Sequence, residues 1–180
     1  QITQKGGHPL FIDNDRKVGE ATMETDQCAL IAEDFVRRIG YEDLQSVWTS
    51  DYKGNVFVNM APVVNDAVIY SDMVKIIVAK DNGEILGLET IAYITNHSER
   101  DFSAPALSQE QAKSKVSSKI ADGITGVRLA MIPVNREEIL TWEITSDWED
   151  LSYIIYLDAN TGEEIEVFRV VENQEGTKLL

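Results

Sequence analysis

The chain has 180 residues, of which 43% are hydrophobic and 26% charged, so it is long enough for one ordinary domain or two small ones and has the composition of a folded protein. Its formal net charge of −15 excludes nucleic acid and anionic lipid surfaces as probable partners. It favours a basic protein partner or a cation-rich milieu, and the alternative is that the acidity serves solubility alone. The sequence contains no apolar run of the roughly 18 residues that a membrane helix needs, and its polar, glycine-rich start is unlike a signal peptide.

The first twenty residues stand apart from the rest of the chain. Leu10-Phe11-Ile12 predicts a short strand and Asp13-Asn14-Asp15 a turn. We interpret residues 1–20 as the trailing strand, or remnant, of a preceding module.

A helix is predicted next, from Thr25 as its N-cap to a stop at Gly40. Its apolar positions follow the i, i+3, i+4, i+7 spacing: Cys28, Ile31, Ala32, Phe35, Val36 and Ile39. Cys28 is the one cysteine, so an intrachain disulfide is excluded, and its place on this stripe predicts a buried small hydrophobe.

After this helix the apolar period shifts toward two. Val56, Val58 and Met60 predict one face of a strand. Asn82-Gly83 between two apolar runs predicts a two-residue hairpin turn, followed by a strand over residues 85–94.

A polar connector then covers residues 96–105. Exposed connectors of this kind are preferred sites of proteolysis, so we predict a proteolytic cleavage site within it. The residues that mark it are Asn96, Ser98, Arg100 and Ser103.

The same order of elements returns after the connector. Ser108 and Gln111 predict a capping box, and Ala112, Val116 and Ile120 give the helix a thinner apolar stripe before Gly123. The strands after this helix show alternation in two sets, and a second turn precedes a strand over residues 165–171. One strand face is formed by Val127, Leu129 and Met131. In the next strand Leu140, Trp142 and Ile144 alternate with Ile139, Thr141 and Glu143. The turn is Asn160-Thr161-Gly162, which we expect to be one residue longer than the first turn.

The repeat predicts an α+β fold of two tandem small modules, each with one helix packed on an antiparallel sheet. We place the modules at residues 21–101 and 102–180.

The sequence offers little for catalysis or metal binding. His8 and His97 each lack a second ligand at metal spacing. Asp13, Asp15 and Glu24 occupy positions one, three and twelve of a calcium loop, but Lys17 and Val18 stand where a ligand and the turn glycine are needed. Nucleophile elbows, phosphate loops and dinucleotide fingerprints are missing from the sequence, so we predict no catalytic residue, no metal and no cofactor.

Trp148 is the candidate for a protein contact. It lies among Asp147, Glu149 and Asp150, in a segment expected to be a loop. An exposed tryptophan with an acidic rim is a plausible anchor for a partner. The alternative is that the ring folds back on its own sheet.

A helix followed by antiparallel strands, with a turn of the form Asp-Asn-Gly-Glu or Asn-Thr-Gly-Glu before the last strand, resembles the PepSY module. Residues 81–85 and 160–164 carry that turn here. Longer strings resemble the YpeB spore germination proteins of endospore-forming bacteria over nearly the whole chain. These are Gly6-Gly7-His8; Asp72-Met73-Val74-Lys75; Tyr93 with His97 and Arg100; Leu107-Ser108 with Glu110 and Ala112; Val127-Arg128-Leu129-Ala130 with Ile132-Pro133; and Gly176-Thr177. The chain departs from that family at Cys28, where a polar or charged residue is usual.

The resemblance implies a non-catalytic regulatory protein on the outer side of the inner spore membrane, in the forespore intermembrane space. It implies an N-terminal membrane anchor outside this chain. It also implies a partner, the lytic transglycosylase SleB, which degrades cortex peptidoglycan and which the modules would restrain and stabilise in the dormant spore. No catalytic residues are carried over from the family.

Two other functions stay open. The modules could form a structural dimerisation unit, in which free sheet faces pair as a homodimer without direct inhibition. An enzyme acting on peptidoglycan is the third possibility, and nothing in the sequence favours it.

Overall fold

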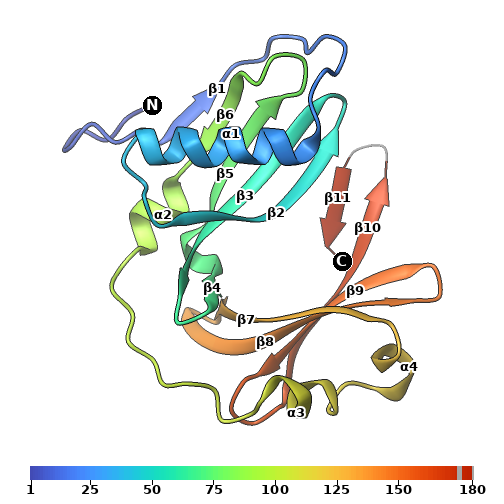
Figure 1. Cartoon of the computed structure of the whole chain (residues 1–180). Helices are drawn as coiled ribbons and strands as arrows, with labels where there is room; N and C mark the ends of the chain where they lie inside the picture. The colour runs from blue at the N-terminus through green and yellow to red at the C-terminus, as the bar shows by residue number, and fades with distance from the viewer. Residues whose placement is uncertain (174–175, 180) are drawn as a thin grey trace. The chain divides into compact units, whose positions relative to one another are not determined.

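The computed structural model describes residues 1–173 and 176–179 (Figure 1). It is an α+β protein in which strand residues outnumber helical residues, so the predicted α+β class is confirmed. The chain divides into two compact units, one made of residues 1–63 and 71–98 and the other of residues 64–70 and 99–180.

The first unit has a five-stranded sheet in the order β1-β6-β5-β3-β2, antiparallel throughout. Its strands are β1 (Phe11–Asp13), β2 (Leu44–Tyr52), β3 (Asn55–Val64), β5 (Val74–Ala79) and β6 (Ile85–Glu89). Helix α1 (Thr25–Arg38) lies across one face of this sheet and packs on β2 and β5 (Figure 1). A short helix, α2 (Ile91–Asn96), follows β6.

The core of the first unit lies between α1 and the sheet. Cys28, Ala32 and Val36 are fully buried on the helix, and Val56, Val58, Met60, Val74, Ile76, Val78 and Leu88 face them from the strands. The predicted stripe of α1 and the predicted face of β3 are therefore confirmed, as is the burial of Cys28. That burial also raises the pKa of the Cys28 thiol.

With Thr25 as the predicted N-cap, helix α1 would begin at residue 26, but it begins one position earlier. Glu24 is the N-cap residue, and the backbone N–H of Glu24 donates to Oε1 of Gln27 at 2.9 Å. Thr25 is thus the first helical residue. Gln27, three positions after Glu24, completes a capping box with it.

The segment predicted as one strand over residues 85–94 is divided. Strand β6 ends at Glu89, and helix α2 begins at Ile91. The hydroxyl of Thr90 donates to the carbonyl of Pro9 at 2.6 Å, and Tyr93 packs against the core and the ring of Tyr41. These tertiary contacts override the local β-propensity of the isoleucines.

The second unit has a sheet in the order β4-β7-β8-β9-β10-β11, in which only the β4–β7 pair is parallel. Its strands are β4 (Ala67–Ile69), β7 (Ile124–Val134), β8 (Glu137–Trp148), β9 (Leu151–Asp158), β10 (Glu164–Asn173) and β11 (Gly176–Leu179). Strand β4 comes from the chain between β3 and β5, and the 3-10 turn Tyr70–Asp72 follows it.

The helix of the second unit is interrupted, contrary to the single helix predicted there. Helix α3 (Gln109–Lys113) and helix α4 (Ser118–Ala121) both pack on β8, and residues 114–117 separate them. The hydroxyl of Ser114 donates to the carbonyl of Gln111 at 2.7 Å, and Ser117 is the N-cap of α4. Serine side chains bond the local backbone and so favour helix ends over helix interiors.

The rest of the second helical segment agrees with the prediction. Ser108 and Gln111 form the capping box, with Ser108 Oγ accepting from the Gln111 N–H at 3.3 Å and Gln111 Oε1 accepting from the Ser108 N–H at 2.8 Å. Ala112 is fully buried, and Val116 and Ile120 pack against the same core. The partners of this stripe are Leu129, Met131, Leu140, Trp142, Ile144, Ile155 and Leu157.

The two glycine turns are equivalent. The N–H of Ala79 donates to Glu84 O, and the N–H of Gly83 donates to Ala79 O. The same two bonds recur 79 positions later, from Asp158 N to Glu163 O and from Gly162 N to Asp158 O. The prediction of a two-residue turn at Asn82-Gly83 is therefore wrong, because residues 80–84 form one longer loop, closed in the same way as the second turn.

The first residues belong to the first unit's sheet. Strand β1 pairs with β6, with Phe11 opposite Glu89 and Ile12 opposite Leu88. The turn after β1 is held by Arg16, whose guanidinium binds Asp81 at 2.8 Å and also contacts Glu84. The interpretation of residues 1–20 as the end of a preceding module stays a prediction.

Candidate binding surface

The helix side of the second unit's sheet continues beyond the two short helices. Trp148 is half-buried at the end of β8, opposite Leu151 on β9. Its ring lies 6.4 Å from the ring of Tyr153, and Leu151 and Val167 are 37% and 40% exposed. Cross-strand pairing places all four on the face that carries Trp142 and Ile144. We call these residues, Trp148, Leu151, Tyr153 and Val167, the Trp148 strip.

The strip is exposed because the helices of this unit are short. Helices α3 and α4 have five and four residues, whereas α1 has fourteen. The covered part of the face lies under Ile120, whose carbonyl accepts a 2.6 Å hydrogen bond from the hydroxyl of Ser146. Beyond Ser146 along β8 the strip begins.

An acidic turn borders the strip. Glu149 has a φ of 54°, which forms the tight connection from Trp148 to Leu151. Asp147 accepts a hydrogen bond from the hydroxyl of Ser152 at 2.6 Å, and Asp150 completes the turn. Asp147 and Ser152 lie on the opposite face of the sheet, so two turn carboxylates, Glu149 and Asp150, border the strip, while the exposed Arg169 lies opposite Tyr153 on the strip's own face. The turn carboxylates are complementary to basic residues on a partner.

The structure places Trp148 at the end of a strand and not in a loop, and its role as a protein contact stays a prediction. The ring packs against Tyr153 of its own sheet, and the side chain remains half-exposed. Leu151, Tyr153 and Val167 were not identified from the sequence. Positions 148, 151 and 153 become neighbours only when Glu149 and Asp150 form a two-residue turn.

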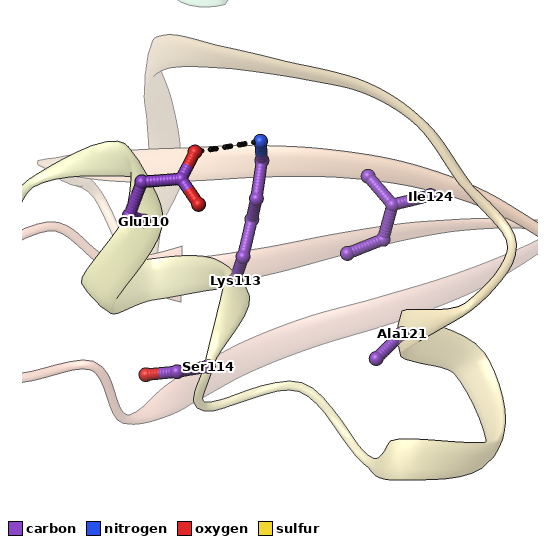
Figure 2. A pocket seen from close by; sticks show the side chains of 5 residues that line it. All are labelled: Glu110, Lys113, Ser114, Ala121 and Ile124. Atoms are coloured by element: carbon purple, nitrogen blue, oxygen red, sulfur yellow. Dashed lines mark hydrogen bonds and ion pairs between the residues drawn. The ribbon is translucent and has the colours of Figure 1, made fainter.

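A shallow hollow of about 420 Å³ lies beside α3 and α4 in the same unit (Figure 2). Glu110, Lys113, Ser114, Ala121 and Ile124 line it, and Lys113 Nζ lies 2.9 Å from Glu110 Oε1. It occupies the space left by the break between α3 and α4. The five lining residues carry no net charge, so they offer no electrostatic attraction to an ionic ligand.

The predicted proteolytic connector is partly anchored. The amide of Asn96, the last residue of α2, donates to Ser71 O at 2.7 Å. Arg100 forms two 2.8 Å bonds to the carboxylate of Glu138, and its side chain is 9% exposed. Ser98 and Ser103 are exposed. Exposed backbone for a protease is therefore offered by Ser103 and its neighbours more than by Arg100.

A buried polar cluster lies on the other face of the second unit's sheet. The carboxylate of Glu143, 3% exposed, accepts hydrogen bonds from the phenols of Tyr70 and Tyr156 at 2.6 and 3.0 Å, and from Arg128 Nε at 2.7 Å. Burial, with the charge of Glu143, raises the pKa of both phenols. Both tyrosines are thus fixed as neutral donors. The cluster is internally satisfied and serves as a structural anchor for Tyr70.

His97 belongs to a second polar cluster, in the first unit. Its Nδ1 lies 2.8 Å from Oδ2 of the fully buried Asp72, and its ring stacks on Tyr93 at 4.2 Å. The phenol of Tyr93 donates to Asp43 at 3.0 Å, and burial, with that bond, raises its pKa. His97 therefore ties the end of α2 to the buried Asp72.

Neither cluster has the make-up of a metal centre. Over residues 1–173 and 176–179, the structure brings no three histidine, cysteine or acidic side chains together at a distance suited to a metal ion. Within the same residues, every buried side-chain nitrogen or oxygen has a hydrogen-bond partner. No helix of the described chain is long and apolar enough to cross a membrane.

Comparison with known proteins identifies the family. Residues 1–103 match the family model described as YpeB sporulation, PepSY1 and PepSY2 domains. Residues 106–168 match the peptidase propeptide and YPEB domain.

Curated relatives carry the same name. The chain is 32% identical over 176 residues to sporulation protein YpeB of Oceanobacillus iheyensis, an alignment that covers 97% of this chain and 38% of that protein. It is 28% identical over 169 residues to sporulation protein YpeB of Bacillus subtilis, covering 92% and 37%. The chain therefore spans less than two fifths of the length of these relatives.

A solved structure shares the fold. The Bacillus megaterium YpeB C-terminal domain matches with a TM-score of 0.80 and 28% identity, over 93% of this chain and 74% of that one. With a family model over more than half of its residues, the chain belongs to the YpeB sporulation protein family.

Proposed function

We propose that this chain is a non-catalytic binding region that restrains and stabilises the cortex-lytic transglycosylase SleB in the dormant spore. Membership of the YpeB sporulation family supports a role in spore germination. The match of residues 106–168 to a peptidase propeptide and YPEB domain supports inhibition, because a propeptide acts by binding an enzyme. In this proposal the chain works on the outer side of the inner spore membrane, held by an anchor in another part of the protein.

The proposal treats the two units as tandem modules of one kind. The equivalent closure of the two glycine turns, 79 positions apart, supports a repeat. Each unit also places helix on one face of an antiparallel sheet, through α1 in the first and through α3 and α4 in the second. The modules differ where the second helix is broken, and that difference exposes the Trp148 strip.

The single observation that carries the proposal is the Trp148 strip with its acidic border. Aromatic anchors in an apolar patch surrounded by charge are typical of protein contacts. With a net charge of −15, the whole chain would also attract a basic partner and speed its association.

The test combines size-exclusion chromatography and light scattering with a cortex lysis assay. The chain is mixed with purified SleB catalytic domain, and each fraction is assayed on purified cortex peptidoglycan. The proposal expects a complex with reduced lysis. Separate elution with full lysis would contradict direct restraint by this chain.

Matched variants locate the contact. Leu151→Lys and Val167→Lys put a positive charge into the strip at exposed positions, and Leu30→Lys does the same on the outer side of α1, where Leu30 is 66% exposed. The first two should weaken the complex and the third should not. Equal weakening by all three would point to a loss of charge attraction rather than to the strip.

The alternative is a structural dimerisation module with no direct inhibitory activity. Its support is the same exposed apolar strip, which could pair with a second copy. Light scattering on the chain alone separates the two, because a dimer that dissociates in Leu151→Lys and does not bind SleB would favour the alternative.

A further inference from the structure

The turn between β5 and β6 contains an asparagine followed by a glycine, Asn82-Gly83, a pair that occurs once in the sequence. Asn82 is exposed, and its Oδ1 accepts hydrogen bonds from Arg16 Nη2 at 2.7 Å and from the N–H of Glu84 at 3.0 Å. The side-chain amide therefore belongs to the same network as the ion pair between Arg16 and Asp81.

The equivalent turn of the second unit is built without this amide. Thr161 takes the place of Asn82, and its hydroxyl oxygen accepts from the N–H of Glu163 at 3.2 Å. Asparagine and threonine side chains can both close a turn in this way, by bonding the backbone two residues on. The turn therefore does not require asparagine, and what Asn82 adds in the first unit is a bond to Arg16 and a reactive amide.

Arg16 holds the segment between β1 and α1 against this turn. Its guanidinium binds the carboxylates of Asp81 and Glu84, and the N–H of Gly19 donates to Asp81 Oδ2 at 2.7 Å. We call residues 14–19 the Arg16 strap. Because Asp81 and Glu84 lie on either side of Asn82-Gly83, the strap bridges the two ends of that dipeptide.

An asparagine followed by glycine loses its amide without an enzyme, and asparagine is accordingly a thermolabile residue. The backbone nitrogen of Gly83 attacks Cγ of Asn82, the Cγ–Nδ2 bond breaks, and ammonia leaves with the proton of the attacking nitrogen. A five-membered succinimide is formed. Water then opens one of its two carbonyls, which gives either aspartate or isoaspartate. Glycine favours the attack because it has no side chain to crowd the nitrogen.

The native turn restrains this reaction at both reacting groups. The N–H of Gly83 donates to the carbonyl of Ala79 at 2.9 Å, so the attacking nitrogen is engaged. The bonds from Arg16 and Glu84 hold the amide of Asn82 in place. Ring closure needs both groups to be released, so the reaction proceeds from a locally opened turn.

We propose that Asn82 is a site of spontaneous deamidation, that the Arg16 strap sets its rate, and that the isoaspartyl product releases the strap. Isoaspartate lengthens the main chain by one methylene between Asp81 and Glu84, which changes the spacing at which Arg16 binds both carboxylates. The aspartyl product leaves the main chain unchanged and adds a carboxylate beside them. The reaction is independent of any lytic enzyme.

Incubation of the 180-residue protein at mildly alkaline pH tests the rate. Conversion at Asn82 is followed by mass spectrometry of the tryptic peptide of residues 81–100, in which Asn96 is an internal reference. Arg16→Gln should speed the conversion by about fivefold or more, because the turn opens more often without the strap. Arg38→Gln is the matched control, since it removes the same charge from an exposed ion pair on α1 and should leave the rate unchanged.

A second variant keeps the test independent of Arg16→Gln. Arg16→Lys retains the positive charge but not the two-pronged geometry, and should give a rate between those of the parent and Arg16→Gln. Circular dichroism shows whether each variant is folded. Failure of Asn82 to convert faster than Asn96 in any of these proteins would overturn the site, and equal rates in the parent and both Arg16 variants would overturn the role of the strap.

Hydrogen exchange tests the release of the strap. The incubated parent is separated by ion exchange, and isoaspartate is identified by its methylation by a purified isoaspartyl methyltransferase. Exchange over residues 14–19 should be about tenfold faster in the isoaspartyl fraction than in the unmodified one. Asn82→Thr, which copies the second turn, is the control and should keep slow exchange after the same incubation. Unchanged exchange in the isoaspartyl fraction would overturn the release.

Discussion

Arg16 and Asp81 lie 65 positions apart and form a two-pronged pair, with Nη1 to Oδ2 and Nη2 to Oδ1 both at 2.8 Å. The N–H of Gly19 also donates to Oδ2 of Asp81 at 2.7 Å. The pair fixes the segment between β1 and α1 over the turn that joins β5 to β6. Hydrogen bonds from Arg16 and Gly19 hold the pKa of Asp81 well below its usual range.

This pair predicts an acid-dependent contribution to stability. Because the pKa of Asp81 is lower in the folded state than the ~3.9 of an unfolded chain, the stabilisation is present above about pH 4 and is lost as the pH falls further. Asp81→Asn should lower the free energy of unfolding at pH 7, and the difference from the parent should shrink below pH 4. Urea unfolding from pH 7 to pH 3 measures both. Asp101→Asn, at an exposed position, is the control; a difference for Asp81→Asn that does not change with pH would contradict the assignment.

The Glu143 cluster predicts a graded loss of stability. Glu143→Ala leaves two buried phenols and Arg128 without their acceptor, and should cost roughly 2–3 kcal/mol of unfolding free energy. The value lies below the 3–5 kcal/mol of a fully buried ion pair, because the Arg128 side chain is 38% exposed and can be hydrated. Tyr156→Phe removes one hydrogen bond and should cost about 1 kcal/mol.

Denaturant unfolding measures these changes. Glu166→Ala is the matched control, since Glu166 lies opposite Tyr156 on the neighbouring strand and is exposed. It should change stability by less than about 0.5 kcal/mol. Equal effects at positions 143 and 166 would mean that the cluster does not stabilise the sheet.

The two equivalent turns predict equivalent glycine requirements. Gly83 and Gly162 have φ values of 75° and 76°, in the left-handed region. Alanine at either position should cost about 1–2 kcal/mol, and asparagine, which tolerates that region better, should cost less. Thermal or urea unfolding of the four variants checks this. A neutral Gly162→Ala would show that the second turn relaxes into another conformation.

The connectivity of the second unit predicts the result of cleaving the connector. Strand β4 and Tyr70 belong to the second unit, although the chain on both sides of residues 64–70 lies in the first. β4 pairs with β7 from Ala67 to Ile69, and Tyr70 donates to Glu143. A cut at Ser103 therefore leaves a strand of the second sheet on the N-terminal fragment.

The two fragments should stay together after the cut. A specific protease site inserted after Ser103 allows cleavage in the native state, followed by size exclusion in buffer and in denaturant. The fragments should elute together in buffer and apart in denaturant. Separation in buffer would show that the cut allows β4 to leave β7. Proteolysis alone would then be a sufficient trigger for releasing a bound enzyme.

The local sequence pattern was enough to predict those helices and strands whose buried residues recur at a regular period. The stripe of α1 and the inner face of β3 predicted buried residues, because that face of each element meets the core. In β8 the alternation predicted which residues share a face, but both faces are buried, with Thr141 and Glu143 at 0% and 3% exposed. The capping box at Ser108 and Gln111 was equally local. The family could also be inferred, since its motifs are runs of adjacent residues.

Contacts between residues far apart in the sequence determine the elements that local patterns did not predict. The end of β6 at Glu89 depends on Thr90 and Tyr93 meeting Pro9 and Tyr41, and the placement of β4 depends on β7, more than fifty positions away. The Trp148 strip likewise exists only when β8, β9 and β10 are aligned in register. Sequence periodicity specifies which side of a strand a residue occupies, but whether that side is covered depends on the length and position of the helix packed upon it.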